Sequence, residues 1–99
     1  MNADEIKQLR NELGWSQDRL GQYLGYTGNA VRRWENDMSK PPDPVMAVLI
    51  QIRSRLDQKK NKERKEEFIQ DLVGIAIGTG IVGFMRYIFN EDEETDEEY

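Results

Sequence analysis

Two glycines, each followed two residues later by a hydroxyl side chain, divide the N-terminal part of this 99-residue chain into short segments. Gly14 precedes Ser16, and Gly25 precedes Thr27. Glycine favours the left-handed conformation that ends a helix, and serine or threonine is a good N-cap for the next helix. The sequence therefore predicts three short helices, over residues 3–13, 17–24 and 28–36.

Apolar residues recur at helical spacing within these segments. The first helix carries one apolar stripe, and the next two carry apolar positions that we expect to bury against it. A fourth helix is predicted from Asp43 as N-cap and Pro44 as first residue, because the prolines at 41 and 42 cannot continue a helix. No strand is predicted, so the fold class is all-α, and residues 1–57 are expected to form a core of their own. The expected core positions of the first three helices are Ile6, Leu9, Leu13, Leu20, Leu24, Val31 and Trp34.

The chain contains no cysteine and no histidine. Their absence removes thiol catalysis, cysteine zinc sites, the Ser-His relay and the usual general base. A chain this short also has little room for an enzyme cleft beside a hydrophobic core. We therefore predict that the protein is not an enzyme and has no catalytic residue, metal site or cofactor.

The net charge of −5 describes one end of the chain. Residues 90–99 hold seven acidic side chains and no basic one, and without them the chain would carry +2. We expect this segment to be a disordered acidic tail. Residues 58–67 carry five basic and three acidic side chains, and they are predicted to be a charged linker or an extension of the fourth helix. A basic patch for DNA or anionic lipid is the competing interpretation.

Residues 68–89 form a hydrophobic, glycine-rich segment whose only charged side chains are Asp71 and Arg86. The uncharged stretch 72–85 is short for a membrane span, since it would be about 21 Å long as a helix against about 30 Å of hydrocarbon. Self-association in water, as a helix or as a hairpin of 73–77 with 81–87, is the favoured interpretation. Membrane insertion as a tail anchor stays open, because basic residues precede the segment and acidic residues follow it.

The spaced glycines, caps and apolar positions between Leu9 and Asn36, followed by RRWEND and PPDPVMAVL, carry a resemblance. Residues 3–56 resemble the repressor/Cro-type (XRE-type) helix-turn-helix family, in particular its small single-domain branch related to antitoxin DNA-binding domains. The resemblance implies a four- to five-helix repressor-like domain at residues 1–57. It also implies an internal ion pair between Arg10 and Glu35.

The family places the start of its second motif helix in the major groove of DNA, which implies base contacts from Gly28, Asn29 and Arg32. The residue types fit, because Asn pairs bidentately with adenine and Arg with guanine. Residues 28, 29 and 32 share one helix face. Glycine at 28 is expected to let the backbone approach the DNA. Contacts to the DNA backbone are expected from Gln17, Thr27, Arg33 and Lys40.

Taken together, the sequence predicts a sequence-specific transcription regulator of bacterial or phage type, a repressor that binds double-stranded DNA as a homodimer. Residues 1–57 carry eight basic and eight acidic side chains, which favours specific recognition by a dimer over tight binding by a monomer. Met1 leads directly into polar residues, so a cytoplasmic location is expected. The alternative is an antitoxin-like or membrane-tethered interaction protein, whose segment 68–89 binds a toxin-like partner or a bilayer.

Overall fold

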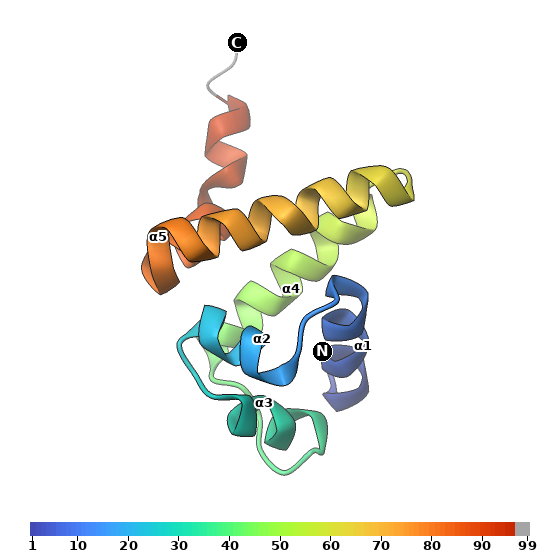
Figure 1. Cartoon of the computed structure of the whole chain (residues 1–99), viewed down its shortest axis with the longest axis vertical. Coiled ribbons are helices and arrows are strands. Elements are labelled where there is room, and N and C mark those ends of the chain that lie inside the picture. The colour runs from blue at the N-terminus through green and yellow to red at the C-terminus, as the bar shows by residue number, and fades with distance from the viewer. Residues whose placement is uncertain (97–99) are drawn as a thin grey trace.

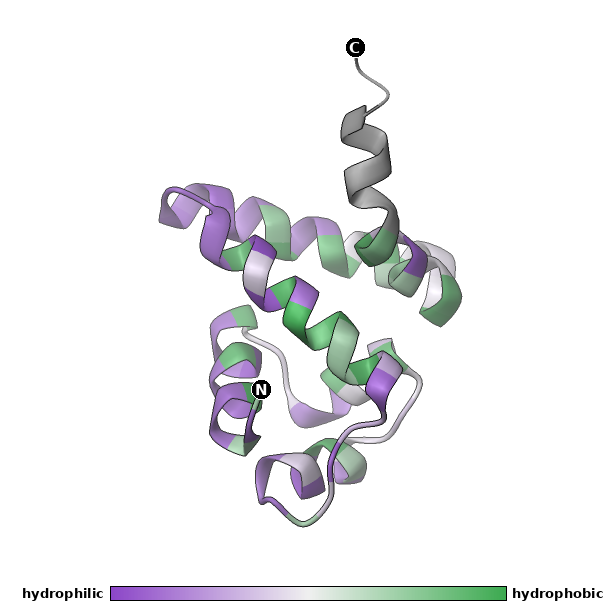
Figure 2. Cartoon of the chain, turned by 180° about the vertical axis from the view of Figure 1, so that it is seen from behind, coloured by the Kyte–Doolittle hydropathy of each residue, from purple (hydrophilic) through white to green (hydrophobic). Residues whose placement is uncertain are grey.

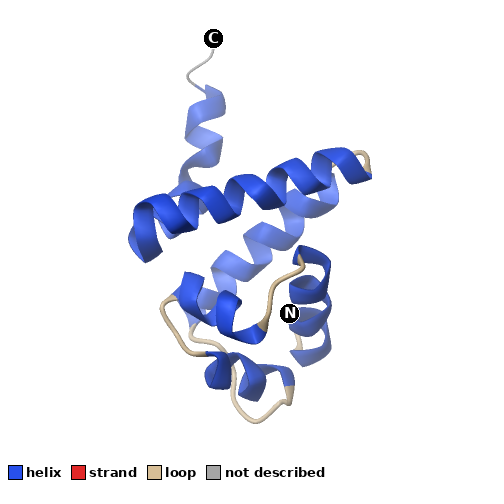
Figure 3. Ribbon diagram, viewed as in Figure 1, coloured by secondary structure: helices blue, strands red, loops and turns tan. Residues whose placement is uncertain are grey.

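The computed structural model describes residues 1–96, and within them the side chains of residues 1–89. The described residues form five helices and no strand, which confirms the all-α fold class (Figure 3). The helices are α1 (Ala3–Leu13), α2 (Gln17–Leu24), α3 (Gly28–Glu35), α4 (Asp43–Gln58) and α5 (Lys62–Asp96).

The predicted glycine C-caps and hydroxyl N-caps lie at the ends and starts of the first three helices. Gly14 and Gly25 adopt left-handed φ angles of 76° and 84° directly after α1 and α2. The Ser16 hydroxyl accepts a hydrogen bond from the N–H of Arg19 at 3.0 Å, and Thr27 caps α3 in the same way. These local caps fix where each short helix starts and stops.

Three boundaries differ from the sequence prediction. Helix α3 ends at Glu35, one residue earlier than expected. Pro42, not Asp43, is the N-cap of α4, and no side chain caps that helix. Asp43 instead lies in the first turn of α4, where its carboxylate suits the positive end of the helix dipole. Residues 58–67 are divided between the end of α4, a short turn and the first turns of α5.

The helices are arranged along an elongated molecule of 46 × 28 × 21 Å (Figure 1). Helices α1, α2 and α3 cluster at one end, α4 runs through the middle, and α5 crosses the opposite end. The middle of helix α4 is apolar in Figure 2, as its central position requires. Helix α3 and helix α5 therefore lie at opposite ends of the protein.

Residues 68–89 belong to α5, so the β-hairpin alternative is wrong. The helix is broken at Gly80, whose φ of 76° and ψ of −166° are not helical. This break lets the part of α5 after Gly80 fold back, so that Phe84 and Ile88 are buried. The predicted disordered tail at 90–99 lies outside the described side chains, and residues 97–99 lie outside the described backbone, so it stays a prediction.

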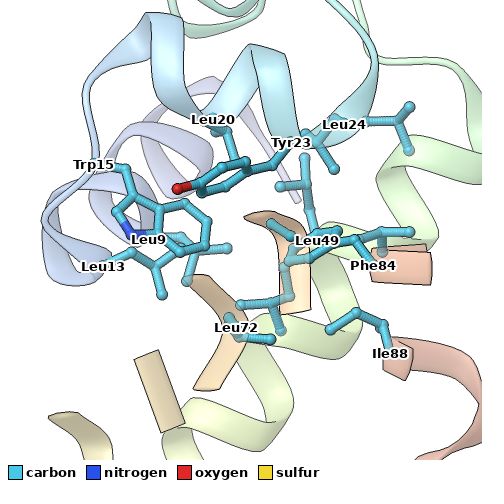
Figure 4. Packing of buried hydrophobic residues seen from close by; sticks show 14 of the residues in the cluster. Leu9, Leu13, Trp15, Leu20, Tyr23, Leu24, Leu49, Leu72, Phe84 and Ile88 are labelled. Carbon is cyan, nitrogen blue, oxygen red and sulfur yellow. The ribbon is translucent and has the colours of Figure 1, made fainter. Parts of the chain in front are cut away.

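The seven core positions predicted in α1, α2 and α3 are all buried, which confirms that part of the core. Figure 4 shows that the core does not end there, because Leu72, Phe84 and Ile88 of α5 point into the same cluster. The ring of Phe84 lies 5.9 Å from that of Tyr23 in α2. The expectation that residues 1–57 form a self-contained core is therefore wrong: α5 closes it.

Polar contacts join the C-terminal half of α4 to α1 and to α5. The buried guanidinium of Arg55 donates a hydrogen bond to the carbonyl of Ile88 in α5. Arg53 pairs with Glu12 of α1 at 2.9 Å and with Asp57. Hydrogen bonding to Arg53 lowers the pKa of the Glu12 carboxyl, and the two carboxylates raise the pKa of Arg53.

The participation of α5 in the core is tested by replacing one phenylalanine at a time. Phe84 is fully buried, so Phe84→Ala is expected to lower the free energy of unfolding by about 3–5 kcal/mol through lost burial and a cavity. Phe89, on the same helix but 47% exposed, is the matched control, and Phe89→Ala is expected to cost about 0.5 kcal/mol or less. Urea denaturation measures both, and equal effects would contradict the core described above.

Candidate nucleic-acid interface

Helices α2 and α3 approach each other so closely that two positions must be glycine. A Cβ atom at Gly21 would lie 2.5 Å from the carbonyl oxygen of Thr27, where no real Cβ is found. A Cβ atom at Gly28 would lie 2.9 Å from Cα of Asp18 and would overlap its carboxylate. Gly28 was expected to allow close approach to DNA, and the structure gives it a second role, the packing of α3 onto α2.

A buried ion pair on the inner side of the motif joins α1 to the end of α3 and fixes the position of α3. Arg10 of α1 donates from Nε to Glu35 Oε2 at 2.6 Å and from Nη2 to Glu35 Oε1 at 3.0 Å. The side chains are 12% and 2% exposed. Nη1 of Arg10 donates to the carbonyl of Trp15, in the α1–α2 turn, at 2.9 Å. One guanidinium therefore connects α1, the turn and the end of α3.

Gln17 joins the same cluster from the first residue of α2. Its Nε2 donates to Glu35 Oε1 at 3.1 Å, and the residue is half-buried. Glu35 therefore accepts hydrogen bonds from two side chains on different helices. The sequence predicted a phosphate contact for Gln17 and missed this structural contact.

The outward face of α3 presents the residues expected to read bases. Asn29 and Arg32 are exposed, whereas Val31 and Trp34 on the other face are buried. Asn29 Oδ1 accepts hydrogen bonds from Arg32 Nη2 at 2.8 Å and from Nε at 3.2 Å. The two side chains form one polar unit, which their spacing of three residues along the helix explains.

The expected backbone contacts surround this pair. Thr27 and Arg33 are exposed at the start and along the outer side of α3, and Lys40 is exposed in the loop before α4. Thr27 Oγ1 accepts from the N–H of Ala30 at 3.1 Å, so its cap role is present in the structure. Asp18 lies beside Gly28 and adds a negative charge near this face.

Residues 6–51 match the family model described as helix-turn-helix. This segment is a repressor/Cro-type helix-turn-helix domain. Neither a curated protein nor a solved structure matches the chain. The matched segment begins in α1, contains α2 and α3, and ends within α4, so α5 lies outside it.

The match over residues 6–51 supports a DNA-binding regulator of the helix-turn-helix type. Its place of action is with the DNA, in the cytoplasm or nucleoid. Within the domain, α2 and α3 are the two motif helices, and the turn between them contains Gly25. Among the residues with described side chains, no group of acidic residues is arranged to hold a metal ion.

The ion pair behind the motif is tested by removing one partner. Glu35→Ala leaves the guanidinium of Arg10 and the amide of Gln17 without their acceptor, and it is expected to lower the free energy of unfolding by about 3 kcal/mol or more. The matched control is Glu12→Ala, which removes an exposed pair with Arg53 and is expected to cost about 1 kcal/mol or less.

The double variant Arg10→Met with Glu35→Leu separates charge burial from packing. It removes both charges together, so it is expected to recover much of the stability lost in Glu35→Ala. Thermal or urea unfolding gives the three values. An unchanged midpoint for Glu35→Ala would show that the pair contributes nothing to the stability of the domain.

Proposed function

We propose that the protein is a sequence-specific transcription regulator, a repressor of bacterial or phage type, which inserts α3 into the major groove of its operator. The observation that supports this most is the exposed unit of Asn29 and Arg32 on a helix whose opposite face is locked to α1 by Glu35. A rigidly held polar pair at the start of a groove-sized helix is suited to direct base readout.

The chemistry of the pair defines the bases it reads. The Asn29 amide nitrogen is able to donate to N7 of adenine while its oxygen accepts from N6, and Arg32 donates in parallel to O6 and N7 of guanine. Because the two side chains already contact each other, they are expected to read neighbouring base pairs as a unit. Binding exchanges part of their mutual hydrogen bonding for hydrogen bonds to bases.

The surrounding groups set the register of α3 on the duplex. Arg33 and Lys40 supply positive charge, and Thr27 and Gln17 supply polar contacts at the starts of α3 and α2. Contacts of this kind go to phosphates, so they position the protein without reading the sequence. Gly28 has no side chain, so the backbone at the start of α3 is able to approach the DNA. The carboxylate of Asp18 beside it opposes close approach of a phosphate.

The regulator acts as a homodimer on a pseudo-palindromic operator. The basic and acidic side chains of residues 1–57 are equal in number, so one domain gains little from non-specific attraction to phosphates. Two linked domains gain from binding two half-sites, about 34 Å apart in successive major grooves. Occupation of the operator would then repress by excluding other proteins from the same DNA.

An antitoxin-like function with a toxin-like protein partner is the alternative. It rests on the resemblance of the sequence to antitoxin DNA-binding domains. Binding to the operator by the chain alone, with repression in the absence of any partner, separates the repressor from this alternative.

The base-reading assignment is tested by Asn29→Ala and Arg32→Ala. Each is expected to weaken binding to the selected operator by about 1–3 kcal/mol and to relax the preference at one base position. Lys40→Ala is expected to weaken binding to all sequences alike, because it removes a phosphate contact. Site selection from random DNA, followed by fluorescence anisotropy titrations at several salt concentrations, measures both effects.

Arg86→Ala is the matched control, since it removes an exposed arginine from α5, outside the helix-turn-helix domain and outside the basic segment 58–67. It should leave the selected sequence and the affinity unchanged. If Asn29→Ala and Arg32→Ala also leave both unchanged, the recognition assignment is wrong.

A further inference from the structure

Helix α5 concentrates the exposed apolar side chains of the described part of the chain. Ile77 is 74% exposed and Val82 is 70% exposed, and Ile81 and Phe89 are 44% and 47% exposed. The helix-turn-helix domain makes no use of this surface for DNA, because α3 lies at the other end of the molecule (Figure 1). An exposed apolar surface of this kind marks an interaction site for another protein or a membrane.

The length and hydropathy of α5 match a lipid bilayer. The part Lys62–Phe89 is 28 residues long, and an 18-residue window within it has a mean hydropathy of 1.7. A straight helix over residues 68–89, the segment that follows the basic residues, spans about 33 Å, close to the roughly 30 Å of hydrocarbon in a bilayer. Only 22% of the window is buried inside the protein, whereas the core helix of a soluble protein is mostly buried.

Three of the four glycines of α5 are not explained by packing within the chain; at the fourth, Gly83, a Cβ would overlap the side chain of Thr79. No atom lies within 4 Å of the position that a Cβ would take at Gly74, Gly78 or Gly80. Only Gly80 has a conformational reason, its positive φ at the break. Glycine destabilises a helix in water, but it is frequent in membrane-spanning helices.

The charges on either side of the apolar segment are complementary to an anionic membrane in one orientation. Five basic residues precede it, and residues 90–99 contain only acidic charges. Basic residues next to a span stay on the cytoplasmic side and attract anionic headgroups. That orientation leaves the helix-turn-helix domain on the side where DNA is. The basic residues are Lys59, Lys60, Lys62, Arg64 and Lys65.

We propose that the apolar part of α5, residues 68–89, inserts into an anionic lipid bilayer and tethers the helix-turn-helix domain to the membrane. In water the break at Gly80 folds this segment back and buries Phe84 and Ile88 in the core. In the bilayer the helix is straight and lipid surrounds these side chains, whereas the part of the core that they leave in α2 and α4 is uncovered, so insertion lowers the stability of the domain. The inference does not depend on which DNA sequence α3 reads, or on whether it reads one.

A substitution at the helix break, Gly80, distinguishes the proposal from a purely structural role, because the proposal predicts an increase in membrane binding. Alanine is disfavoured at a φ of 76°, but it is favourable in a straight helix. Gly80→Ala is therefore expected to penalise the folded-back form and to increase the membrane-bound fraction several-fold. A purely structural role of Gly80 would lower stability without moving the protein to membranes.

Flotation of the full chain with lipid vesicles tests the proposal. The chain is expected to float with vesicles that contain phosphatidylglycerol, more than with pure phosphatidylcholine, and to stay bound through an alkaline carbonate wash. Ile77→Gln removes an exposed apolar side chain without disturbing the core, and it is expected to lower the bound fraction about tenfold. Ile50→Gln, at an exposed isoleucine of α4, is the matched control and should have no effect.

Three results would overturn the proposal. The chain stays in the soluble fraction with both kinds of vesicle, or it floats but is released by carbonate, which would indicate surface binding through the basic residues alone. In the third, the chain does not float and instead sediments as a dimer that Ile77→Gln dissociates, which assigns the exposed face of α5 to a second copy. DNA titrations of the same variants report on the domain separately, so a failure of membrane insertion is distinguishable from a failure of DNA binding.

Discussion

The bidentate pair between Arg10 and Glu35 is the constraint on which the DNA-binding geometry depends. A buried pair of this kind contributes little net stability, because desolvation offsets much of the attraction, but separating its partners leaves a buried charge without compensation. Here the partners come from α1, the α1–α2 turn, the start of α2 and the end of α3. The far end of α3 is therefore fixed, while its outward face stays exposed.

The close contact between α2 and α3 completes this constraint from the other end. Gly21 and Gly28 remove the side chains that would separate the helices, so the start of α3 rests on α2. Asn29 and Arg32 project from the helix just beyond this contact, and their mutual hydrogen bonds hold them in one place. Helix α5 adds the last support, because the ring of Phe84 packs against Tyr23 of α2.

The sequence predicts the local elements of this fold well and its long-range packing poorly. Gly14, Ser16, Gly25 and Thr27 act within a few residues, so their caps and helix boundaries are readable from the chain. The expected base-contact residues are also readable from the sequence, because they lie on one short helix. The return of α5 at Gly80 is not readable, since a glycine among apolar residues is compatible with a straight helix, a bend or a hairpin. The same ambiguity hides the contribution of α5 to the core.

The central claim, that α2 and α3 present one preorganised face to DNA, is tested most directly by nuclear magnetic resonance. Backbone amide shifts of the full chain are followed while selected operator DNA is added. The account predicts the largest changes between Gln17 and Arg33, with the exposed residues of α5 unchanged. Changes concentrated on α5, or an α3 that does not respond to DNA that binds, would contradict it.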